Sequence, residues 1–335
     1  MKRSVTLASI LIAVLVAGIL APASAQGVSL TVYSGRTREL VAPILEQFTK
    51  ATGIAVRARY GETAELAATI MEEGANSPAD VYVAQDAGAL GALAFGGHLR
   101  RLPDAILQRV EPRFRSGDGL WVGISGRARV VVYNTRNLTT RDLPASIADF
   151  TTPRWRGRIG WAPTNGSFQA QVTAMRLLWG NERTRRWLLG IKANAPRVYR
   201  NNTAIVAAVG AGEIDVGFVN HYYLFQFLRE RGTSFPARNY FFPGPDVGNL
   251  INVAGAGVVT TSRNIAAATR LVEFLLSADA QRYFANETFE YPLVVGVAAH
   301  PLLPPLGQIR TPAVDLNHLQ ALEETLRVLR EAGIL

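Results

Sequence analysis

Two stretches of the chain decide the fold: residues 121–133, WVGISGRARVVVY, and residues 249–260, NLINVAGAGVVT. Each has the apolar, β-branched and small residues that are typical of a long β-strand, although residues 125–129 interrupt the first. Alternating strand and helix patterns lie between the two stretches, and a similar series precedes them. A chain that builds one α/β unit, then a second, and then returns must cross between the units twice. We therefore predict an α/β fold of two lobes, joined by two crossing strands that form a hinge, with a ligand cleft between the lobes.

The crossings also predict how the chain is divided. We expect residues 26–127 with 253–303 to form the N-terminal lobe, and residues 128–252 with 304–335 to form the C-terminal lobe. The length of 335 residues suits two domains of ordinary size, and 48% apolar with 18% charged residues is typical of a chain that buries a core. A last helix is expected from about His318, with Asn317 as its N-cap.

Residues 1–25 have the pattern of a secretory signal peptide. Lys2 and Arg3 precede an apolar run at residues 5–20, and Ala23-Ser24-Ala25 supplies the small residues of a cleavage site. The run of 16 residues is shorter than the ~20 that a membrane-spanning helix needs, which argues against an anchor. No second long apolar run follows, and the chain has no cysteine to carry a lipid. We expect cleavage near Ala25 and an exported, soluble protein in a bacterial periplasm.

The charge pattern and the residue types exclude several functions. Without Lys2 and Arg3, 33 basic residues stand against 26 acidic ones, a net charge of +7. The arginines are scattered and form no stripe with aromatic residues, so nucleic acid is not expected as a partner. The chain contains no phosphate-binding loop, nucleophile elbow, His-Glu-x-x-His motif or dinucleotide fingerprint, and its four histidines are dispersed. We find no nucleophile–base pair and predict a binding protein rather than a hydrolase, a transferase or another enzyme.

One cluster, residues 220–223 (NHYY), contains side chains that could bind a metal ion. Asn220 is a good N-cap at the junction of a predicted strand and helix, so Tyr222 and Tyr223 would lie in the first helical turn, at the positive end of the dipole. A phenol there would ionise on binding a trivalent metal, and phenolate oxygen is a hard donor that suits ferric iron. The spacing alone favours the other interpretation, in which Tyr222, Tyr223, Phe225 and Phe227 belong to an aromatic helix that packs on a sheet.

Six different motifs follow one another along the chain in a distinctive order. They are residues 31–36 (TVYSGR), 77–82 (SPADVY), 125–134 (SGRARVVVYN), 152–160 (TPRWRGRIG), the Tyr222-Tyr223 pair, and 290–293 (EYPL). With these motifs the chain resembles the periplasmic ferric-iron-binding proteins, also called bacterial transferrins, over nearly all of its length after the signal peptide. The resemblance implies the type II periplasmic solute-binding protein fold. It also implies that Tyr222 and Tyr223 are iron ligands, and that Tyr133 is the third tyrosine ligand that some members have. The other role open to Tyr133 is packing at the end of a strand.

The N-terminal lobe departs from one branch of that family. Thr37 stands where some members have a histidine ligand, Gln85 where they have a glutamate, and Arg38 where others have a tyrosine. The chain therefore resembles the branch that uses three tyrosines and an exogenous anion. Three phenolates would balance Fe³⁺, and a dianion added to them would need positive neighbours.

The resemblance implies two candidate sets of residues for the anion. Arg36 and Arg127 are candidates for holding carbonate or bicarbonate through charge-assisted hydrogen bonds, with salt bridges at the hinge as their alternative role. Family members that bind phosphate instead use polar groups at a helix start, and the matching residues here are Asn165, Gly166, Ser167, Asn202 and Asn220.

The function implied by the resemblance is transport. We expect a monomeric receptor that binds Fe³⁺ and delivers it to an inner-membrane ABC permease with its cytoplasmic ATPase. One alternative is a receptor of the same fold for a phosphate-bearing or other small organic anion, since a fold does not determine its ligand. Another is a periplasmic subunit that binds the same ligand for signalling.

Overall fold

The computed structural model describes residues 27–335, so the predicted signal peptide and its cleavage site lie outside the described residues. The strands are β1 (Ser29–Ser34), β2 (Ala55–Tyr60), β3 (Val81–Ala84), β4 (Leu99–Arg100), β5 (Val122–Asn134), β6 (Ile159–Trp161), β7 (Arg197–Val198), β8 (Val216–Asn220), β9 (Ala237–Tyr240) and β10 (Ile251–Val259). The α-helices are α1 (Arg38–Thr52), α2 (Thr63–Glu73), α3 (Ala87–Phe95), α4 (Asp104–Leu107), α5 (Gly166–Trp179), α6 (Asn181–Ala193), α7 (Asn202–Ala211), α8 (Tyr222–Arg231), α9 (Ile265–Leu275), α10 (Ala278–Asn286) and α11 (Leu322–Glu331).

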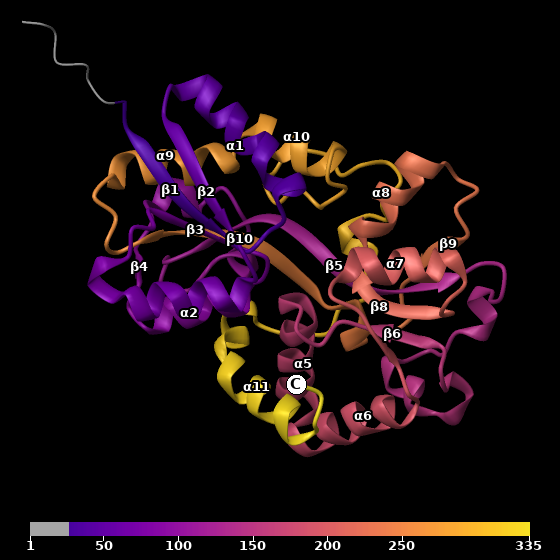
Figure 1. Cartoon of the computed structure of the whole chain (residues 1–335). Helices are drawn as coiled ribbons and strands as arrows, with labels where there is room; N and C mark the ends of the chain where they lie inside the picture. The colour runs from indigo at the N-terminus through magenta and orange to yellow at the C-terminus, as the bar shows by residue number, and fades with distance from the viewer. Residues whose placement is uncertain (1–26) are drawn as a thin grey trace, which may run out of the picture.

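The strands form one continuous mixed sheet, in the order β2-β1-β3-β10-β5-β8-β6-β7, with β4 paired to β10 and β9 paired to β5. Parallel pairs occur at both ends of the sheet, β1 with β2 and β3 on one side and β6 with β7 and β8 on the other. Figure 1 shows the N-terminal strands at the left, β8 and β6 at the right, and β5 and β10 running between the two groups. The architecture therefore has two α/β halves joined through the sheet.

The two stretches expected to cross between the lobes are the two long central strands. In β10, Ile251 pairs with Ala128 and Ala256 with Val122, so both strands run together through the middle of the molecule. Beyond Ala128, β5 continues without β10 into the C-terminal half, where it pairs with β8 from Arg129 opposite Asn220. All thirteen residues of β5 and all nine of β10 are buried, which explains their nearly unbroken apolar character.

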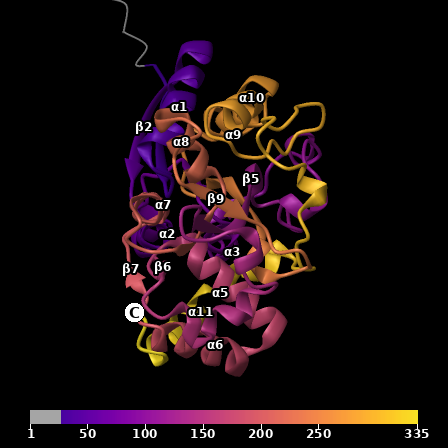
Figure 2. The ribbon, with the colours of Figure 1, turned by 90° about the vertical axis from the view of Figure 1, so that its right-hand side faces the viewer.

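The helices form where the apolar periodicity predicts them. In α1, residues 40, 41, 44, 45 and 48 are buried, which is the spacing of one helical face packed against a sheet. The helix ends at Gly53, whose φ of 72° is left-handed backbone that glycine adopts without strain. Helices α9 and α10 lie at one end of the molecule, and α5, α6 and α11 lie at the other (Figure 2).

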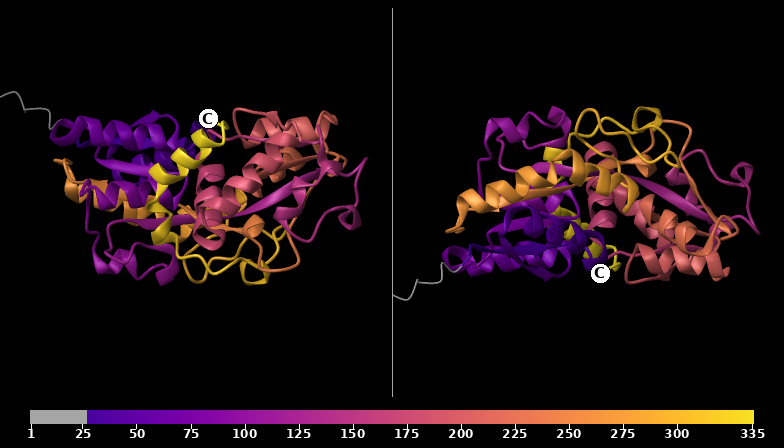
Figure 3. Two further views of the ribbon diagram at one scale, coloured as in Figure 1. Left: turned by 90° about the horizontal axis from the view of Figure 1, so that it is seen from below. Right: turned by 90° about the horizontal axis from the view of Figure 1, so that it is seen from above.

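The C-terminal segment differs from the prediction. The chain forms a 3₁₀ turn at Leu316–Gln320 before α11 begins at Leu322, so no α-helix starts at Asn317. The turn packs on α3 of the N-terminal half so closely that a Cβ on Gly88 would lie 2.7 Å from the Leu319 carbonyl oxygen. Helix α11 instead joins α5 of the C-terminal half, where the hydroxyl oxygens of Thr173 and Thr325 are 2.7 Å apart. Seen from below, the yellow segment lies between the two halves (Figure 3).

Among residues 27–335, no helix is both long enough and apolar enough to cross a membrane.

Candidate functional site

The tyrosine pair lies where β8 ends and α8 begins, near the middle of the sheet. Tyr222 is fully buried and Tyr223 is 5% exposed, and their ring centroids are 4.3 Å apart. The Tyr222 hydroxyl is buried and has no hydrogen-bond partner among the described residues. Burial, followed by the neighbouring Tyr222, raises the pKa of the Tyr223 phenol well above its usual value of 10. Without a bound cation, Tyr223 is therefore neutral.

His221 has a structural role between these tyrosines and the crossing strand. Its Nδ1 accepts the Ala128 N–H at 3.1 Å, and its Nε2 lies 2.8 Å from the Phe289 carbonyl oxygen and donates to it. Burial lowers the pKa of the imidazole to about 4. The ring is neutral near pH 7 and both nitrogens are engaged, so it offers no lone pair to a ligand.

Arg36, one of the predicted anion-binding residues, forms a buried ion pair. Its two terminal nitrogens donate to the two carboxylate oxygens of Glu290, both at 2.7 Å, and neither side chain is exposed. Ser125 donates to the same carboxylate at 3.0 Å. Burial opposes ionisation of Glu290, but Arg36 outweighs it and holds the pKa of that carboxyl below its usual value. The guanidinium carbon lies 5.9 Å from the centroid of the Tyr222 ring, so the ion pair also borders the tyrosines.

Arg127, the other predicted anion-binding residue, has no such partner. It is 1% exposed, and none of its three guanidinium nitrogens makes a hydrogen bond within residues 27–335. Burial lowers the pKa of this arginine; Tyr222, Asp86 and Glu290 favour its charged form, and Arg36 opposes it. A buried, unpaired guanidinium is costly, which makes Arg127 the strongest anion-binding candidate in the cleft.

The residues predicted for phosphate are brought together in the C-terminal half. Asn165 caps α5 by accepting the Ser167 N–H, and the same oxygen accepts from Asn202 at 3.1 Å. Asn202 accepts the Asn220 N–H at 2.9 Å, and the Asn220 amide donates to the Ser167 hydroxyl at 2.9 Å. Asn220 is the last residue of β8 and its side chain does not cap α8, contrary to the sequence prediction. The cluster is thus largely bonded to itself.

Arg129 completes this network, although sequence reasoning did not single it out. It donates to Gln171 at 3.1 Å, to Asn220 at 3.2 Å and to Asn202 at 3.3 Å. Burial lowers its pKa to about 9. Side chains two apart on a strand share a face, so Ser125, Arg127 and Arg129 all face the cleft, and this alternation could have identified Arg129 in advance.

The two halves touch at Gly166, the first residue of α5. A Cβ atom there would lie 2.7 Å from Oδ2 of Asp86, at the start of α3, and 3.5 Å from Cβ of Thr63. Only a residue without a side chain allows this approach. The structure therefore has the cleft closed, and the Asp86 contact had no signal in the sequence because it arises only where the halves meet.

A cavity of about 290 Å³ remains at the mouth of the closed cleft. Its lining includes Arg36 and Gln85 from the N-terminal half, and Asn165 and Tyr223 from the C-terminal half. The side-chain nitrogen of Gln85 is buried without a partner in the described part of the chain. The cavity places Tyr223 within reach of solvent and is the natural route to the tyrosines.

Tyr133 is not brought to this cluster. It shares the face of β5 that carries Arg127 and Arg129, but it pairs with Val216, at the opposite end of β8 from Asn220. Four residues of strand separate Tyr133 from Arg129, which corresponds to roughly 13 Å. The register therefore places Tyr133 at the far end of the strand, and this placement favours its other predicted role, packing at a strand end.

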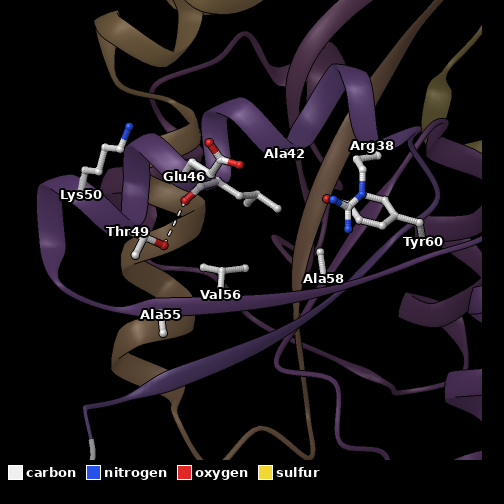
Figure 4. Close-up of a pocket in the computed structure, with 10 residues that line it drawn as sticks. Arg38, Ala42, Glu46, Thr49, Lys50, Ala55, Val56, Ala58 and Tyr60 are labelled. Carbon is white, nitrogen blue, oxygen red and sulfur yellow. Dashed lines mark hydrogen bonds between the residues drawn. The ribbon is translucent and has the colours of Figure 1, made fainter.

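A second hollow lies between α1 and β2, and its walls come from the N-terminal half alone. Figure 4 shows Lys50, Glu46 and Thr49 on one side and Arg38 beside Tyr60 on the other. The Arg38 guanidinium carbon lies 5.4 Å from the centroid of the Tyr60 ring. Arg38 therefore stacks on a tyrosine of this groove, and none of the predicted site residues lines it.

No group of three or more His, Cys, Asp or Glu residues that could hold a metal ion occurs in residues 27–335. The side chains near Arg127 that could supply hard anionic donors are the phenols of Tyr222 and Tyr223 and the carboxylates of Asp86 and Glu290. Glu290 is already engaged by Arg36 and Asp86 caps α3, so a metal bound at this point would depend mainly on phenolate oxygen.

Comparisons with known proteins identify the family of the chain. The family model for bacterial extracellular solute-binding proteins matches residues 76–312. The major ferric iron-binding protein of Neisseria meningitidis serogroup A is 36% identical over 328 residues, covering 96% of this chain and 97% of the relative. The Fe(3+)-binding periplasmic protein of Serratia marcescens is 33% identical, covering 94% and 93%.

Among solved structures, iron-bound HitA from Pseudomonas aeruginosa superposes with a TM-score of 0.88 at 37% identity, covering 91% of this chain and 99% of that one. The predicted resemblance and the predicted two-lobed fold class are confirmed. The relatives carry the names of binding proteins, as expected for a chain predicted not to be an enzyme.

Proposed function

The chain belongs to the family of bacterial extracellular solute-binding proteins, and on that premise we propose that it is a periplasmic receptor for ferric iron. The observation that carries this proposal is the buried pair Tyr222 and Tyr223, set beside an unpaired guanidinium. Two adjacent phenols are a poor lining for an organic anion. Their oxygens are hard donors that become anionic when a trivalent metal displaces their protons.

The companion anion is proposed to bind at Arg127. Arg36 is already engaged by Glu290, so its salt-bridging role is favoured and it orients the site from behind Tyr222. Arg127 is free to donate two parallel hydrogen bonds to carbonate or hydrogencarbonate, as planar guanidinium groups do. The phosphate alternative is less well supported, because the polar groups of Asn165, Ser167, Asn202 and Asn220 bond to one another.

Transport follows from the family. We propose that the division into lobes is the predicted one at the crossings, except that the C-terminal segment belongs to both lobes. The receptor would act as a monomer, close on its cargo and deliver it to an ABC permease in the inner membrane. Acid would favour release, since each phenolate must be protonated before the metal leaves.

The test is a visible spectrum of residues 26–335 titrated with ferric citrate, with and without hydrogencarbonate. We expect a saturable tyrosinate-to-iron charge-transfer band that Tyr222→Phe and Tyr223→Phe each abolish or displace. Tyr199→Phe, which alters a tyrosine whose hydroxyl contacts Glu213 and does not line the cavity, is the matched control and should leave the band unchanged. No band at any iron concentration would overturn the iron proposal and favour a receptor for a small organic anion.

A further inference from the structure

We infer that Asp86 selects the companion anion, admitting oxyanions that carry a proton, such as hydrogencarbonate, and rejecting those that carry none, such as sulfate. The inference rests on the proposed function, because it concerns the anion at Arg127. It adds a specificity-determining residue from the N-terminal half, which was expected to contribute no ligand to the iron.

The two oxygens of Asp86 have different surroundings. Oδ1 accepts the Ala89 N–H at 3.2 Å and so caps α3. Oδ2 is buried, in a residue only 4% exposed, and has no hydrogen-bond partner among the described residues. A capping role accounts for one oxygen and leaves the other unexplained, because a buried acceptor without a donor is costly.

Arg127 is the neighbouring cation. Asn252 pairs with Arg127 across β10 and β5, and its side-chain oxygen accepts the Ala87 N–H at 3.3 Å, so the turn that carries Asp86 lies against Arg127. Burial raises the pKa of the Asp86 carboxyl, and the charge of Arg127 opposes that rise and favours the ionised form. No hydrogen bond joins the two side chains, although one has three unpaired nitrogens and the other an unpaired oxygen.

Oδ2 also faces the C-terminal half. It lies 2.7 Å from the point where a Cβ on Gly166 would stand, at the first turn of α5. An anion held by Arg127 in the closed cleft is therefore bordered by a carboxylate oxygen as well as by donors. The Tyr222 hydroxyl is another buried polar group without a partner among the described residues, and it lies near Arg127.

The chemistry follows from counting donors and acceptors. Arg127 can only donate, and an ionised carboxylate can only accept. Hydrogencarbonate satisfies both, since two of its oxygens accept from the guanidinium and its O–H donates to Oδ2. Sulfate has no proton to donate near neutral pH, so it would place an oxygen against Oδ2 and leave both without a hydrogen. A site built to accept a proton discriminates strongly against a ligand that lacks it.

The test compares sulfate with hydrogencarbonate in two readouts on the full mature chain. The first is calorimetric titration of each sodium salt into the iron-free protein, in degassed, sealed buffer. The second is the anion concentration that half-develops the ferric–tyrosinate band. The variant is Asp86→Asn, since asparagine also caps helices and its amide can donate to an anion. The matched control is Glu62→Gln, which removes a carboxylate that lines the cavity at the mouth of the cleft.

We expect wild type and Glu62→Gln to prefer hydrogencarbonate by at least about tenfold, and Asp86→Asn to gain sulfate binding and lose that preference. Equal binding of the two anions by wild type would overturn the inference. So would binding of neither anion, or an unchanged ratio in a folded Asp86→Asn. The calorimetric arm needs no iron, so a missing charge-transfer band contradicts the iron proposal alone.

Discussion

Two regions of the cleft differ in how far their buried polar groups have hydrogen-bond partners. In the wall formed by α5, α7 and β8, the amides and Arg129 bond to one another, and Arg129 Nη2 and Gln169 Oε1 are left without a partner in the described part of the chain. At the centre, only two residues away along β5, Arg127 has three unpaired nitrogens, and Asp86 and Tyr222 each have an unpaired oxygen. Each such group costs about 1–3 kcal/mol. The difference teaches that folding alone satisfies most of the polar groups of the wall, whereas the Arg127 guanidinium has no hydrogen-bond partner within residues 27–335 until something binds there.

The largest effect on stability is expected at the ion pair of Arg36 and Glu290, which lies beside the unpaired groups of the centre. Glu290→Gln leaves Arg36 buried and without its counter-charge, and it should lower the free energy of unfolding by about 3–5 kcal/mol. Urea denaturation of the iron-free chain measures this loss. A loss below about 1 kcal/mol would mean that this pair is no better satisfied than Arg127.

The same pair predicts a pH dependence. Arg36 holds the folded-state pKa of Glu290 below its unfolded value, so the unfolded chain takes up this proton first. The stabilisation is fully present above an unfolded pKa of about 4.3, and it is lost as the pH falls through the lower folded pKa. The difference in unfolding free energy between wild type and Glu290→Gln should therefore shrink below about pH 4.3. A difference that stayed constant down to pH 3 would contradict this assignment.

A pair of variants on one strand tests the comparison directly. Arg129→Met leaves acceptors on Gln171 and Asn220 without a donor, so it should cost about 2 kcal/mol of stability. Arg127→Met removes an unpaired buried charge, so it should leave stability unchanged or raise it by about 1 kcal/mol, while anion-dependent iron binding is lost. Thermal unfolding and the iron titration measure the two effects. Equal destabilisation by both variants would erase the distinction between the wall and the centre.

The smallest effect is expected at Tyr133. Because the register places it about 13 Å from Arg129, Tyr133→Phe should leave the charge-transfer band and the apparent iron affinity within twofold of wild type. Tyr222→Phe in the same titration is the comparison. A band lost in Tyr133→Phe would restore the third tyrosine to the site.

Much of the fold could be predicted from sequence, because long buried strands carry a strong apolar pattern. The crossing strands β5 and β10 lie within two residues of the expected ends. The pairing of the two tyrosines was equally accessible, since adjacency in sequence at a strand–helix junction survives folding. These features depend on local pattern, and local pattern is what a single sequence records best.

The features that could not be read from the sequence share a physical cause. Tyr133 has the right residue type and faces the right way, but its distance from the site depends on strand register. Asp86 and Gly166 meet only because two distant segments close on each other. Asn220 looks like a helix cap, yet its side chain is drawn into the hydrogen bonds of Arg129 and Ser167. Tertiary contact, rather than propensity, decides all three.

The C-terminal segment has a mechanical consequence. Two crossing strands alone would let the lobes both bend apart and twist about each other. The turn at Leu316–Gln320 rests on one lobe and α11 on the other, which adds a third attachment away from the sheet. Three attachments that do not lie on one line resist torsion. We therefore expect the lobes to open by rotation about a single axis. Shortening or cutting the C-terminal segment should allow the lobes to twist about each other as well.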